Sequence, residues 1–324
     1  MAKKRSLTRH PILIKDEKHG LPYSKGLMAS SIMATGLMPY EAYEVAKKIE
    51  DHLRSSRKQT VSVKELRRVT LQTLKNSFGE AYAEKFRQWQ SLSKLDKPLI
   101  ILIGGTTGVG KSTVAGEIAH RLGINRFIST DAIREVMRAI FSQELMPALY
   151  KSSFDAWEDL RVPLAENGDP VVIGFSEQTA AVSVGVRAMI ERSIKESTNQ
   201  IIEGVHLVPG FVNFSDFDDD ALIISMIITV ADKDLHRSHF YIRELETEGT
   251  RPFKRYRANF DNIRTIGDFI VRRATELDIP VVDSQNLDTT VSIVLEEIIA
   301  LIAAHIAESS TENTVAELIG EEVQ

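Results

Sequence analysis

Hydrophobic residues repeat with different periods in the two parts of the chain. Residues 11–23 contain two short apolar stretches around a polar run that ends in Gly20, which predicts a small hairpin. Apolar residues then recur every three or four positions, which predicts helices over residues 24–36, 39–53, 62–78 and 80–92. Ser24 can cap the first of these helices, and Leu27, Ile32 and Met33 are expected to be buried in it. Ser62 and Glu65 form a capping box at the start of the third helix.

From residue 98 onward, strands alternate with helices, which is typical of a parallel sheet covered on both faces. Leu99-Ile100-Ile101-Leu102-Ile103 is apolar at every position, as a strand buried on both faces requires. Further strands are predicted at residues 126–130, 200–203, 222–230 and 279–282, and helices at residues 177–196, 260–276 and 288–306. We therefore expect a mostly helical domain over residues 1–95, an α/β domain over residues 96–308, and an acidic, mobile tail over residues 309–324.

A glycine-rich motif joins the first strand of the α/β domain to the next helix. Gly105-Thr106-Thr107-Gly108-Val109-Gly110-Lys111-Ser112 matches the P-loop pattern at every position. Its glycines let backbone N–H groups surround a phosphate, Lys111 reaches the β- and γ-phosphates, and the Ser112 hydroxyl ligates Mg²⁺ or another divalent cation. The predicted ATP-binding residues are Gly105, Thr106, Thr107, Gly108, Val109, Gly110, Lys111, Ser112 and Thr113.

Charged residues follow the next two strands, at the sheet edge where open α/β proteins bind ligands. Asp131 and Arg134, one helical turn apart, can hold an acceptor hydroxyl and an anionic group; alternatively, Asp131 caps its helix. Glu203 ends the third strand, where a P-loop enzyme usually keeps an aspartate that ligates or orients the metal shell. His206 either faces the acceptor or is a hydrogen-bonded structural residue.

A basic segment follows the fourth strand. It contains five arginines, namely Arg237, Arg243, Arg251, Arg255 and Arg257. Gly249-Thr250-Arg251-Pro252 interrupts the helical pattern, so the segment is either a lid that closes over transferring phosphates or a solvated basic loop. His236 and His239 lie three positions apart in this segment, but they lack the further ligands that a zinc site needs.

The composition of the 324 residues, 43% hydrophobic and 26% charged, is that of a soluble globular protein. The absence of cysteine excludes a disulfide scaffold, a thiolate zinc site and a cysteine nucleophile, and it fits a reducing compartment. The longest uncharged apolar run, residues 221–231, is too short to span a bilayer, and no apolar signal segment follows the basic N-terminus. We therefore expect a cytoplasmic protein with no membrane partner.

The net charge of −5 is unevenly distributed. Residues 1–97 carry 20 basic and 10 acidic side chains, and the remaining residues carry 20 basic and 35 acidic ones. The first part therefore either meets an anionic partner or has a solvated basic surface. Aromatic residues make up 7% of the chain, too few for a base-stacking platform, so we do not expect a nucleic-acid partner.

Three segments of the α/β domain, residues 103–113, 129–138 and 203–210, resemble the archaeal 2-phosphoglycerate kinases. The resemblance covers most of residues 98–308 and implies a P-loop kinase-type parallel sheet flanked by helices. It also implies transfer of the ATP γ-phosphoryl group to 2-phosphoglycerate. In methanogens, the product 2,3-bisphosphoglycerate feeds synthesis of a cyclic bisphosphoglycerate that protects proteins from heat.

On this interpretation, each charged residue receives a role. Lys111, Asp131, Arg251 and Arg255 are expected to be catalytic, and Ser112 and Glu203 to hold the metal. Asp131, Arg134, Arg138, His206 and Arg257 are expected to bind the acceptor.

The N-terminal segments Ile14-Lys15-Asp16 and Pro22-Tyr23-Ser24-Lys25-Gly26 are similar to an ATP-cone, the nucleotide-sensing domain of ribonucleotide reductases. The similarity implies that Lys15 and Lys25 contact the phosphates of a second, regulatory nucleotide. Two other functions stay open: a P-loop kinase for another small anionic or hydroxylated metabolite, and an ATP-sensing regulator that binds DNA. Regulators of the second kind usually carry a cysteine zinc ribbon, which this chain lacks. A homo-oligomer is compatible with the sequence.

Overall fold

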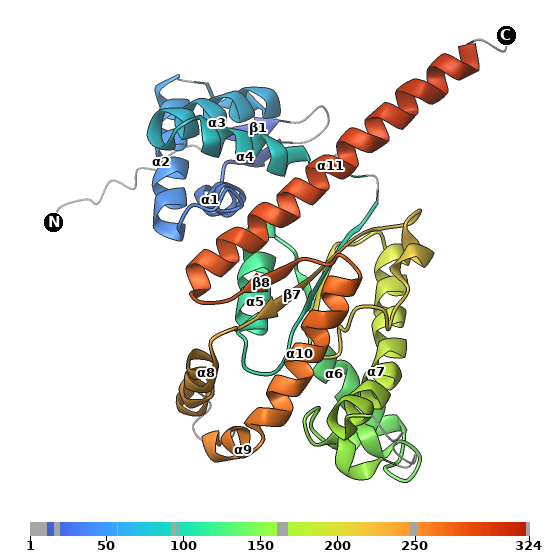
Figure 1. The fold of residues 1–324 in the computed structure, drawn as a ribbon. Coiled ribbons are helices and arrows are strands. Elements are labelled where there is room, and N and C mark those ends of the chain that lie inside the picture. The colour runs from blue at the N-terminus through green and yellow to red at the C-terminus, as the bar shows by residue number, and fades with distance from the viewer. Residues whose placement is uncertain are drawn as a thin grey trace. The chain divides into compact units, whose positions relative to one another are not determined.

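The computed structural model describes residues 12–15, 20–56, 58–91, 95, 97–160, 168–246 and 252–321, without the side chains of residues 91, 246 and 308–321. The chain divides into two compact units, which are described separately. One unit takes in residues 1–94, 121–123 and 303–324, and the other takes in residues 95–120 and 124–302. Figure 1 shows the helices and strands of both units.

The N-terminal unit combines a three-stranded sheet with four helices. Strands β1 (Leu13–Lys15) and β2 (Gly20–Pro22) form the expected antiparallel hairpin, and β3 (Thr60–Ser62) pairs with β1 in parallel, so the order is β2-β1-β3. The sequence pattern did not predict β3, because three residues are too few to show an alternation. The helices are α1 (Lys25–Met33), α2 (Pro39–Ser55), α3 (Val63–Phe78) and α4 (Glu80–Ser91).

Two predicted caps are confirmed in the N-terminal unit, and one predicted core residue is wrong. The Ser24 and Ser62 side chains accept hydrogen bonds from Leu27 N at 3.3 Å and Glu65 N at 3.1 Å. The Glu65 carboxylate does not complete the capping box but accepts from Lys58 Nζ at 2.7 Å. Ile32 is fully buried, whereas Leu27 is 73% exposed. Five helical residues correspond to about 500°, so the two side chains point about 140° apart around α1.

The second unit is built on a parallel sheet of five strands. Its order is β5-β6-β4-β7-β8, and all neighbouring strands run parallel. The strands are β4 (Leu99–Gly104), β5 (Arg126–Ser129), β6 (Gln200–Gly204), β7 (Leu222–Thr229) and β8 (Val281–Asp283). All five strand predictions and the predicted α/β class are therefore confirmed. The central strand β4 is buried at every residue and leads directly into the P-loop.

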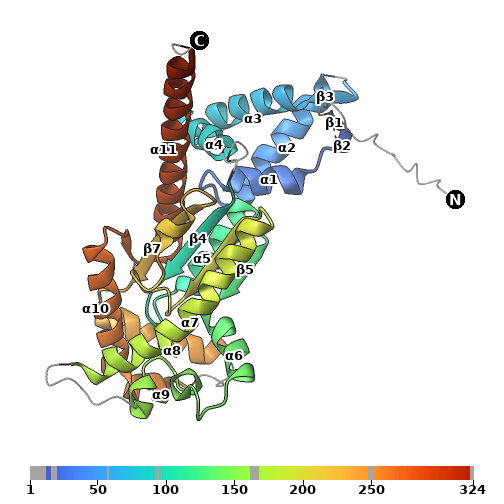
Figure 2. The same cartoon turned by 90° about the vertical axis from the view of Figure 1, so that its right-hand side faces the viewer.

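Helices cover both faces of this sheet. On one face, Ile100 and Leu102 of β4 pack against the buried side of α6 (Thr130–Ile140) and α7 (Pro170–Lys195), and Ile227 of β7 packs against α10 (Phe260–Glu276). On the other face lie α5 (Lys111–Leu122) and the beginning of α11 (Leu287–Glu321), as Figures 1 and 2 show. The remaining helices are α8 (Lys233–Glu246), α9 (Phe253–Ala258) and the short 3-10 helices at Pro147–Tyr150, Ala156–Asp159 and Phe214–Phe217.

Two helix boundaries differ from the predictions by more than three residues. Helix α7 begins at Pro170 rather than near residue 177, and the Asp169 side chain caps it by accepting from Val171 N at 2.9 Å. Its first turns contain β-branched residues and Gly174, which have weak helix propensity, and packing decides the outcome: a Cβ on Gly174 would overlap the backbone of Trp157. Helix α11 was expected to end near residue 306, but it continues to Glu321, because no proline interrupts it.

Residues Leu287–Ala307 of α11 are long and apolar enough, by length and composition alone, to cross a membrane. The buried residues of this segment are Thr290, Val291, Val294, Leu295, Ile298, Ile299 and Ile302. They are spaced mainly three or four apart, so they lie on one face of the helix.

Candidate active site

The P-loop connects the carboxyl end of β4 to the first turn of α5, so backbone amides and the helix N-terminus meet there. Gly105 has φ +144° and Gly108 has φ +87°, conformations that residues with a side chain rarely adopt. A Cβ on Gly105 would overlap the carbonyl oxygen of Ile228, and one on Gly108 would overlap the ring of Phe240. These glycines are therefore required by the surrounding protein even before a phosphate binds.

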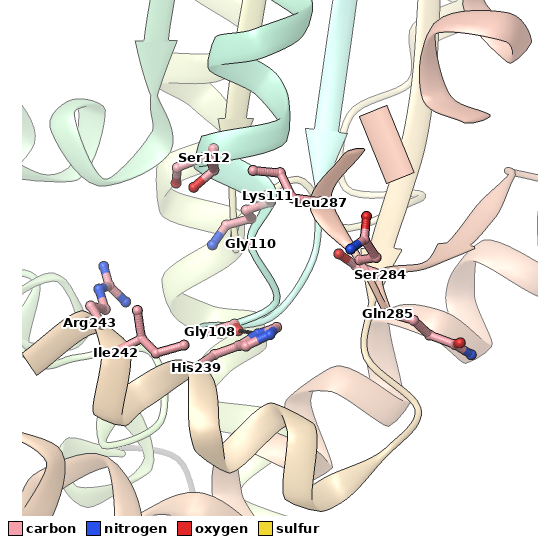
Figure 3. A pocket seen from close by; sticks show the side chains of 12 residues that line it. Gly108, Gly110, Lys111, Ser112, His239, Ile242, Arg243, Ser284, Gln285 and Leu287 are labelled. Carbon is pink, nitrogen blue, oxygen red and sulfur yellow. Dashed lines mark hydrogen bonds between the residues drawn. The ribbon is translucent and has the colours of Figure 1, made fainter. Parts of the chain in front are cut away.

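The P-loop cavity has a volume of about 340 Å³. Three segments line it: P-loop residues Gly108, Gly110, Lys111, Ser112 and Thr113, residues His239, Ile242 and Arg243 of α8, and residues Ser284, Gln285, Asn286 and Leu287 after β8. In Figure 3, Arg243 and Ile242 lie on one side, Ser284 and Gln285 lie on the other, and Lys111 lies between them. The Lys111 ammonium group donates to the Thr106 carbonyl at 3.4 Å, a long bond that a phosphate oxygen can replace.

The carboxylate cavity has a volume of about 270 Å³ and shares Lys111, Ser112 and Arg243 with the P-loop cavity. Its other lining residues are Thr107, Ser129, Asp131, Arg134, Ser152, Ser153, Phe154, Glu203, Gly204, Val205, Pro252, Arg255 and Tyr256. The structure thus places Asp131, Arg134, Glu203 and Arg255 around one cavity, next to the lysine of the P-loop.

Asp131 and Arg134 point into the carboxylate cavity from the first turns of α6. Ser129 caps this helix by accepting from Ala132 N at 3.1 Å, so the alternative that Asp131 is the cap is wrong. The Asp131 carboxylate is 66% exposed and lies 3.5 Å from Arg134 Nε. Arg134 is 14% exposed and donates to the carbonyls of Leu149 at 2.8 Å and Lys151 at 3.2 Å. These bonds hold the guanidinium in place, whereas the carboxylate remains accessible.

Glu203 is a buried carboxylate at the carboxyl end of β6, with an exposed fraction of 5%. Within the described residues, its Oε2 atom has no hydrogen-bond partner. Burying such an oxygen without a partner is unfavourable. A divalent cation or its bound water would satisfy Oε2, and the Ser112 hydroxyl on the same cavity adds a second hard oxygen ligand.

Metal binding at this site would depend mainly on the nucleotide. Among the described residues, no three or more His, Cys, Asp or Glu side chains are grouped so that they could hold a metal ion. Ser112 and Glu203 alone provide few ligands, so phosphate oxygens and water must complete the shell of a cation bound there. This donor set fits a cation that arrives with ATP.

The predicted lid arginines have different environments. Arg255 lines the carboxylate cavity and donates to Ser152 Oγ at 2.8 Å and to Asp155 Oδ2 at 3.0 Å. Arg257 is exposed and lies on neither cavity, and Arg251 lies outside the described residues. Arg243 lines both cavities, with its guanidinium 5.8 Å from the Tyr256 ring centre.

Besides Arg257, the structure places two further expected acceptor residues, Arg138 and His206, outside the carboxylate cavity. Arg138 donates to Glu135 Oε1 at 2.6 Å and lies 4.9 Å from the Tyr150 ring centre. His206 is 2% exposed, and its two ring nitrogens lie 2.9 Å from Thr130 Oγ1 and 3.0 Å from Gln178 Oε1. Burial lowers the pKa of His206 to about 4, so the ring is neutral at physiological pH. Of the two roles considered for His206, this environment is that of a hydrogen-bonded structural residue rather than one that faces the acceptor.

Within the P-loop, Gly105, Thr106 and Val109 face the protein and line neither cavity. The Thr106 side chain is buried and donates to the Ile263 carbonyl at 3.0 Å. Sequence reasoning did not assign a site role to Arg243, to the serines Ser152 and Ser153, or to residues 284–287. Both Arg243 and residues 284–287 could have been predicted from the sequence. Arg243 belongs to the arginine cluster of the basic segment, and residues 284–287 follow the end of a strand, where ligands often bind.

In the N-terminal unit, Lys25 pairs with Glu50 at 3.0 Å, and Arg54 donates to the same carboxylate at 2.6 Å. The hydrogen bond that Lys25 donates to Glu50 raises the pKa of Lys25, and the hydrogen bond that Glu50 accepts from Arg54 lowers the pKa of Glu50. Lys15 ends β1 and is exposed. A phosphate that binds Lys25 would therefore have to compete with Glu50.

The all-parallel sheet, the P-loop after its central strand and the charged cavity beside that loop define a P-loop kinase. No protein-family model matches the sequence. The chain is 39% identical to a 2-phosphoglycerate kinase of Methanopyrus kandleri over 301 residues, which are 93% of this chain and 90% of the relative. The 2-phosphoglycerate kinase of Methanothermobacter thermautotrophicus is 39% identical over 285 residues, with 88% and 92% covered. The chain therefore belongs to the 2-phosphoglycerate kinase family.

Two solved kinase structures are also similar to this chain. Shikimate kinase from Acinetobacter baumannii in complex with shikimate has a TM-score of 0.39 and 14% identity, and the match covers 66% of this chain and 98% of that one. A gluconokinase from Sinorhizobium meliloti has a TM-score of 0.36 and 18% identity, with 67% and 97% covered.

Proposed function

We propose that this protein transfers the γ-phosphoryl group of ATP to the free hydroxyl of 2-phosphoglycerate, which yields ADP and 2,3-bisphosphoglycerate. The main observation is that Lys111 and Ser112 line both the P-loop cavity and the carboxylate cavity. A γ-phosphoryl group on the P-loop would lie at the border between them, within reach of an acceptor in the second. The names of the relatives support 2-phosphoglycerate as that acceptor.

The charges of the carboxylate cavity match this acceptor. Its lining contains four cationic side chains, Lys111, Arg134, Arg243 and Arg255, and two carboxylates, Asp131 and Glu203. 2-Phosphoglycerate carries a carboxylate and a phosphate, and ATP adds further negative charge beside them. Charge-assisted hydrogen bonds from Arg134 and Arg255 would hold the acceptor anions, and Arg243 would reach the transferring group.

In the proposed reaction, the acceptor hydroxyl oxygen attacks the γ-phosphorus, and the bond to the β–γ bridging oxygen breaks, so ADP leaves with the electron pair. The hydroxyl proton passes to the Asp131 carboxylate, whose exposure to the cavity allows this contact. Lys111 stabilises negative charge on the β- and γ-phosphate oxygens. Arg134 contacts Asp131 and would also bind the acceptor, so that the acceptor hydroxyl is positioned next to the Asp131 carboxylate.

Ser112 and Glu203 would hold the divalent cation, which we propose is Mg²⁺. When bound, the cation would supply positive charge that offsets the negative charge of the ATP phosphates. Glu203 would accept a hydrogen bond from a water beside the cation through its Oε2 atom, which has no partner within the described residues. The cysteine-free composition and the ATP requirement favour the cytoplasm as its location. We further propose that the product feeds synthesis of cyclic 2,3-bisphosphoglycerate.

We also propose that the N-terminal unit is an ATP-cone-like regulatory domain that binds a second nucleotide through Lys15 and Lys25. The basic charge of residues 1–97 supports an anionic ligand. Equilibrium binding of ATP to the wild type and to the Lys25→Ala variant is the test. Two sites per chain in the wild type and one in the variant are expected; one site in both would contradict a regulatory nucleotide.

The test of the catalytic proposal is ADP release from Mg·ATP with 2-phosphoglycerate, with 3-phosphoglycerate and without acceptor. We expect stimulation by the 2-isomer alone and loss of activity in the Lys111→Ala and Asp131→Asn variants. Equal stimulation by both isomers, or by neither, would contradict the proposed acceptor. Undiminished turnover of Lys111→Ala would contradict the mechanism itself.

A further inference from the structure

Two histidines of α8 donate hydrogen bonds to consecutive carbonyls of the P-loop. His236 Nε2 lies 2.8 Å from the Thr107 carbonyl oxygen, and His239 Nδ1 lies 2.9 Å from the Gly108 carbonyl oxygen. A carbonyl oxygen only accepts, so each of these ring nitrogens must carry the proton. Three helical residues correspond to about 300°, which places both rings on the same face of α8.

These hydrogen bonds determine which way the P-loop amides point. In a trans peptide, the carbonyl and the next N–H lie in one plane and point in opposite directions. Among the described residues there is no cis peptide bond. Holding the Thr107 carbonyl toward α8 therefore directs the Gly108 N–H away from α8, and holding the Gly108 carbonyl does the same for Val109 N–H. Outward carbonyls and inward amides are the arrangement that binds phosphate in a P-loop.

Tight packing holds the first of these rings in place. His236 is fully buried, with ring-centre distances of 5.2 Å to Phe240 and 5.4 Å to Phe260. Phe240 also lies directly against Gly108. Burial lowers the pKa of His236 to about 4, so the ring stays neutral and carries a single proton, on Nε2. The packed ring limits a glycine-rich loop that would otherwise sample many conformations.

The same helix extends to the phosphoryl-transfer site. His239 lines the P-loop cavity in Figure 3, and Arg243, one turn further along α8, lines both cavities. A change in the position of α8 would therefore move the P-loop carbonyls and Arg243 together.

We propose that His236 and His239 are positioning residues that orient the P-loop amides toward the phosphates of ATP. They act through the Thr107 and Gly108 carbonyls and do not touch the reacting atoms. The inference rests on the proposed function only in that the P-loop binds ATP, and it does not depend on the acceptor.

The experiment compares replacements that keep or remove each donor. In His236→Gln, the amide nitrogen occupies the position of Nε2, and in His239→Asn it occupies the position of Nδ1; leucine at either site removes the donor. Dissociation constants for ATP and for adenosine are measured without acceptor, together with thermal unfolding. The exposed His120 of α5, replaced by Gln, is the matched control.

We expect each leucine variant to bind ATP about 3- to 10-fold more weakly, the usual effect of one lost hydrogen bond, while the amide variants recover most of this affinity. Adenosine lacks phosphates, so its affinity should stay unchanged in all variants. His239→Leu keeps the test informative if His236→Leu fails to fold, because His239 is only half-buried.

Three results would overturn the proposal: unchanged ATP affinity in the leucine variants, equal losses in the amide and leucine variants, or parallel losses of ATP and adenosine. A wild-type protein that binds no ATP would overturn it as well. A wild-type protein that binds ATP but does not phosphorylate 2-phosphoglycerate would refute the proposed acceptor only, and the variants would still decide the role of the histidines.

Discussion

Replacing Glu203 by glutamine should make the protein more stable and less active at the same time. The carboxylate is 5% exposed, and its Oε2 atom has no hydrogen-bond partner within the described residues. An unsatisfied buried polar group costs about 1–3 kcal/mol, and a charged one costs more than a neutral amide. We expect Glu203→Gln to raise the free energy of unfolding by about 1 kcal/mol, which corresponds to about 1.5 °C in melting temperature at this chain length.

The expected loss of activity follows from the same oxygen. A hydrogen bond to a charged group contributes about 1.5–3 kcal/mol, which corresponds to a reduction of about 10- to 150-fold in kcat/KM. If Glu203 has the proposed role in the cation shell, the variant should also need more Mg²⁺ to reach half of its maximal rate.

Both effects are measured on one preparation, by thermal unfolding without ligands and by steady-state kinetics over a range of Mg²⁺ concentrations. Glu191→Gln is the control, since Glu191 is 54% exposed and pairs with Arg187 on α7. A lower melting temperature for Glu203→Gln would mean that the carboxylate stabilises the fold. Unchanged kinetics at every Mg²⁺ concentration would refute its role in the cation shell.

Three further predictions concern the P-loop, the acceptor and pH. Gly108→Ala should lose ATP binding in a titration, because φ is +87° and the new methyl group would overlap Phe240; wild-type affinity would refute the reading of this contact. Arg134→Lys should raise KM for 2-phosphoglycerate more than KM for ATP, since one ammonium cannot replace a guanidinium bonded to two carbonyls and Asp131. Burial lowers the pKa of His206 and His236 from 6.5 to about 4. The unfolded chain therefore binds more protons below pH 6.5, and the free energy of unfolding should fall by about 3 kcal/mol per histidine between pH 6.5 and 4. Urea unfolding at several pH values measures this fall, and a flat profile would contradict neutral burial.

The strands β4 and β7 of the sheet were predictable because they are apolar at nearly every position. A strand buried on both faces has few polar residues, so β4 and β7 stand out without any knowledge of their neighbours. The helix α10 was predicted with correct boundaries for a similar reason, since its buried residues follow the helical period. The first turns of α7 were missed because Gly174 is selected by its contact with Trp157, and such a contact is not visible in local sequence.

Within the site, the backbone motif was predictable and several side-chain orientations were not. Asp131 and Arg138 lie on the same short helix, yet Asp131 lines the cavity and Arg138 turns to Glu135 and Tyr150. The orientation of each side chain depends on which hydrogen-bond or ion-pair partners lie near it in the folded protein, and the sequence pattern does not show these partners. The two histidines of α8 were considered only as zinc ligands, because a hydrogen bond to a distant carbonyl leaves no residue pattern.

The three residues shared by the two cavities, Lys111, Ser112 and Arg243, have a consequence for inhibitor design. Consider a compound that joins adenosine, through a chain of phosphates, to a glycerate group. It would occupy both cavities and contact all three shared residues at the same time. Because its two ends are linked, the second binding step would be intramolecular and would gain from a high effective concentration. Selectivity would come from the glycerate end, since the P-loop is common to many ATP-binding enzymes, whereas Arg134 and Arg255 line only the carboxylate cavity.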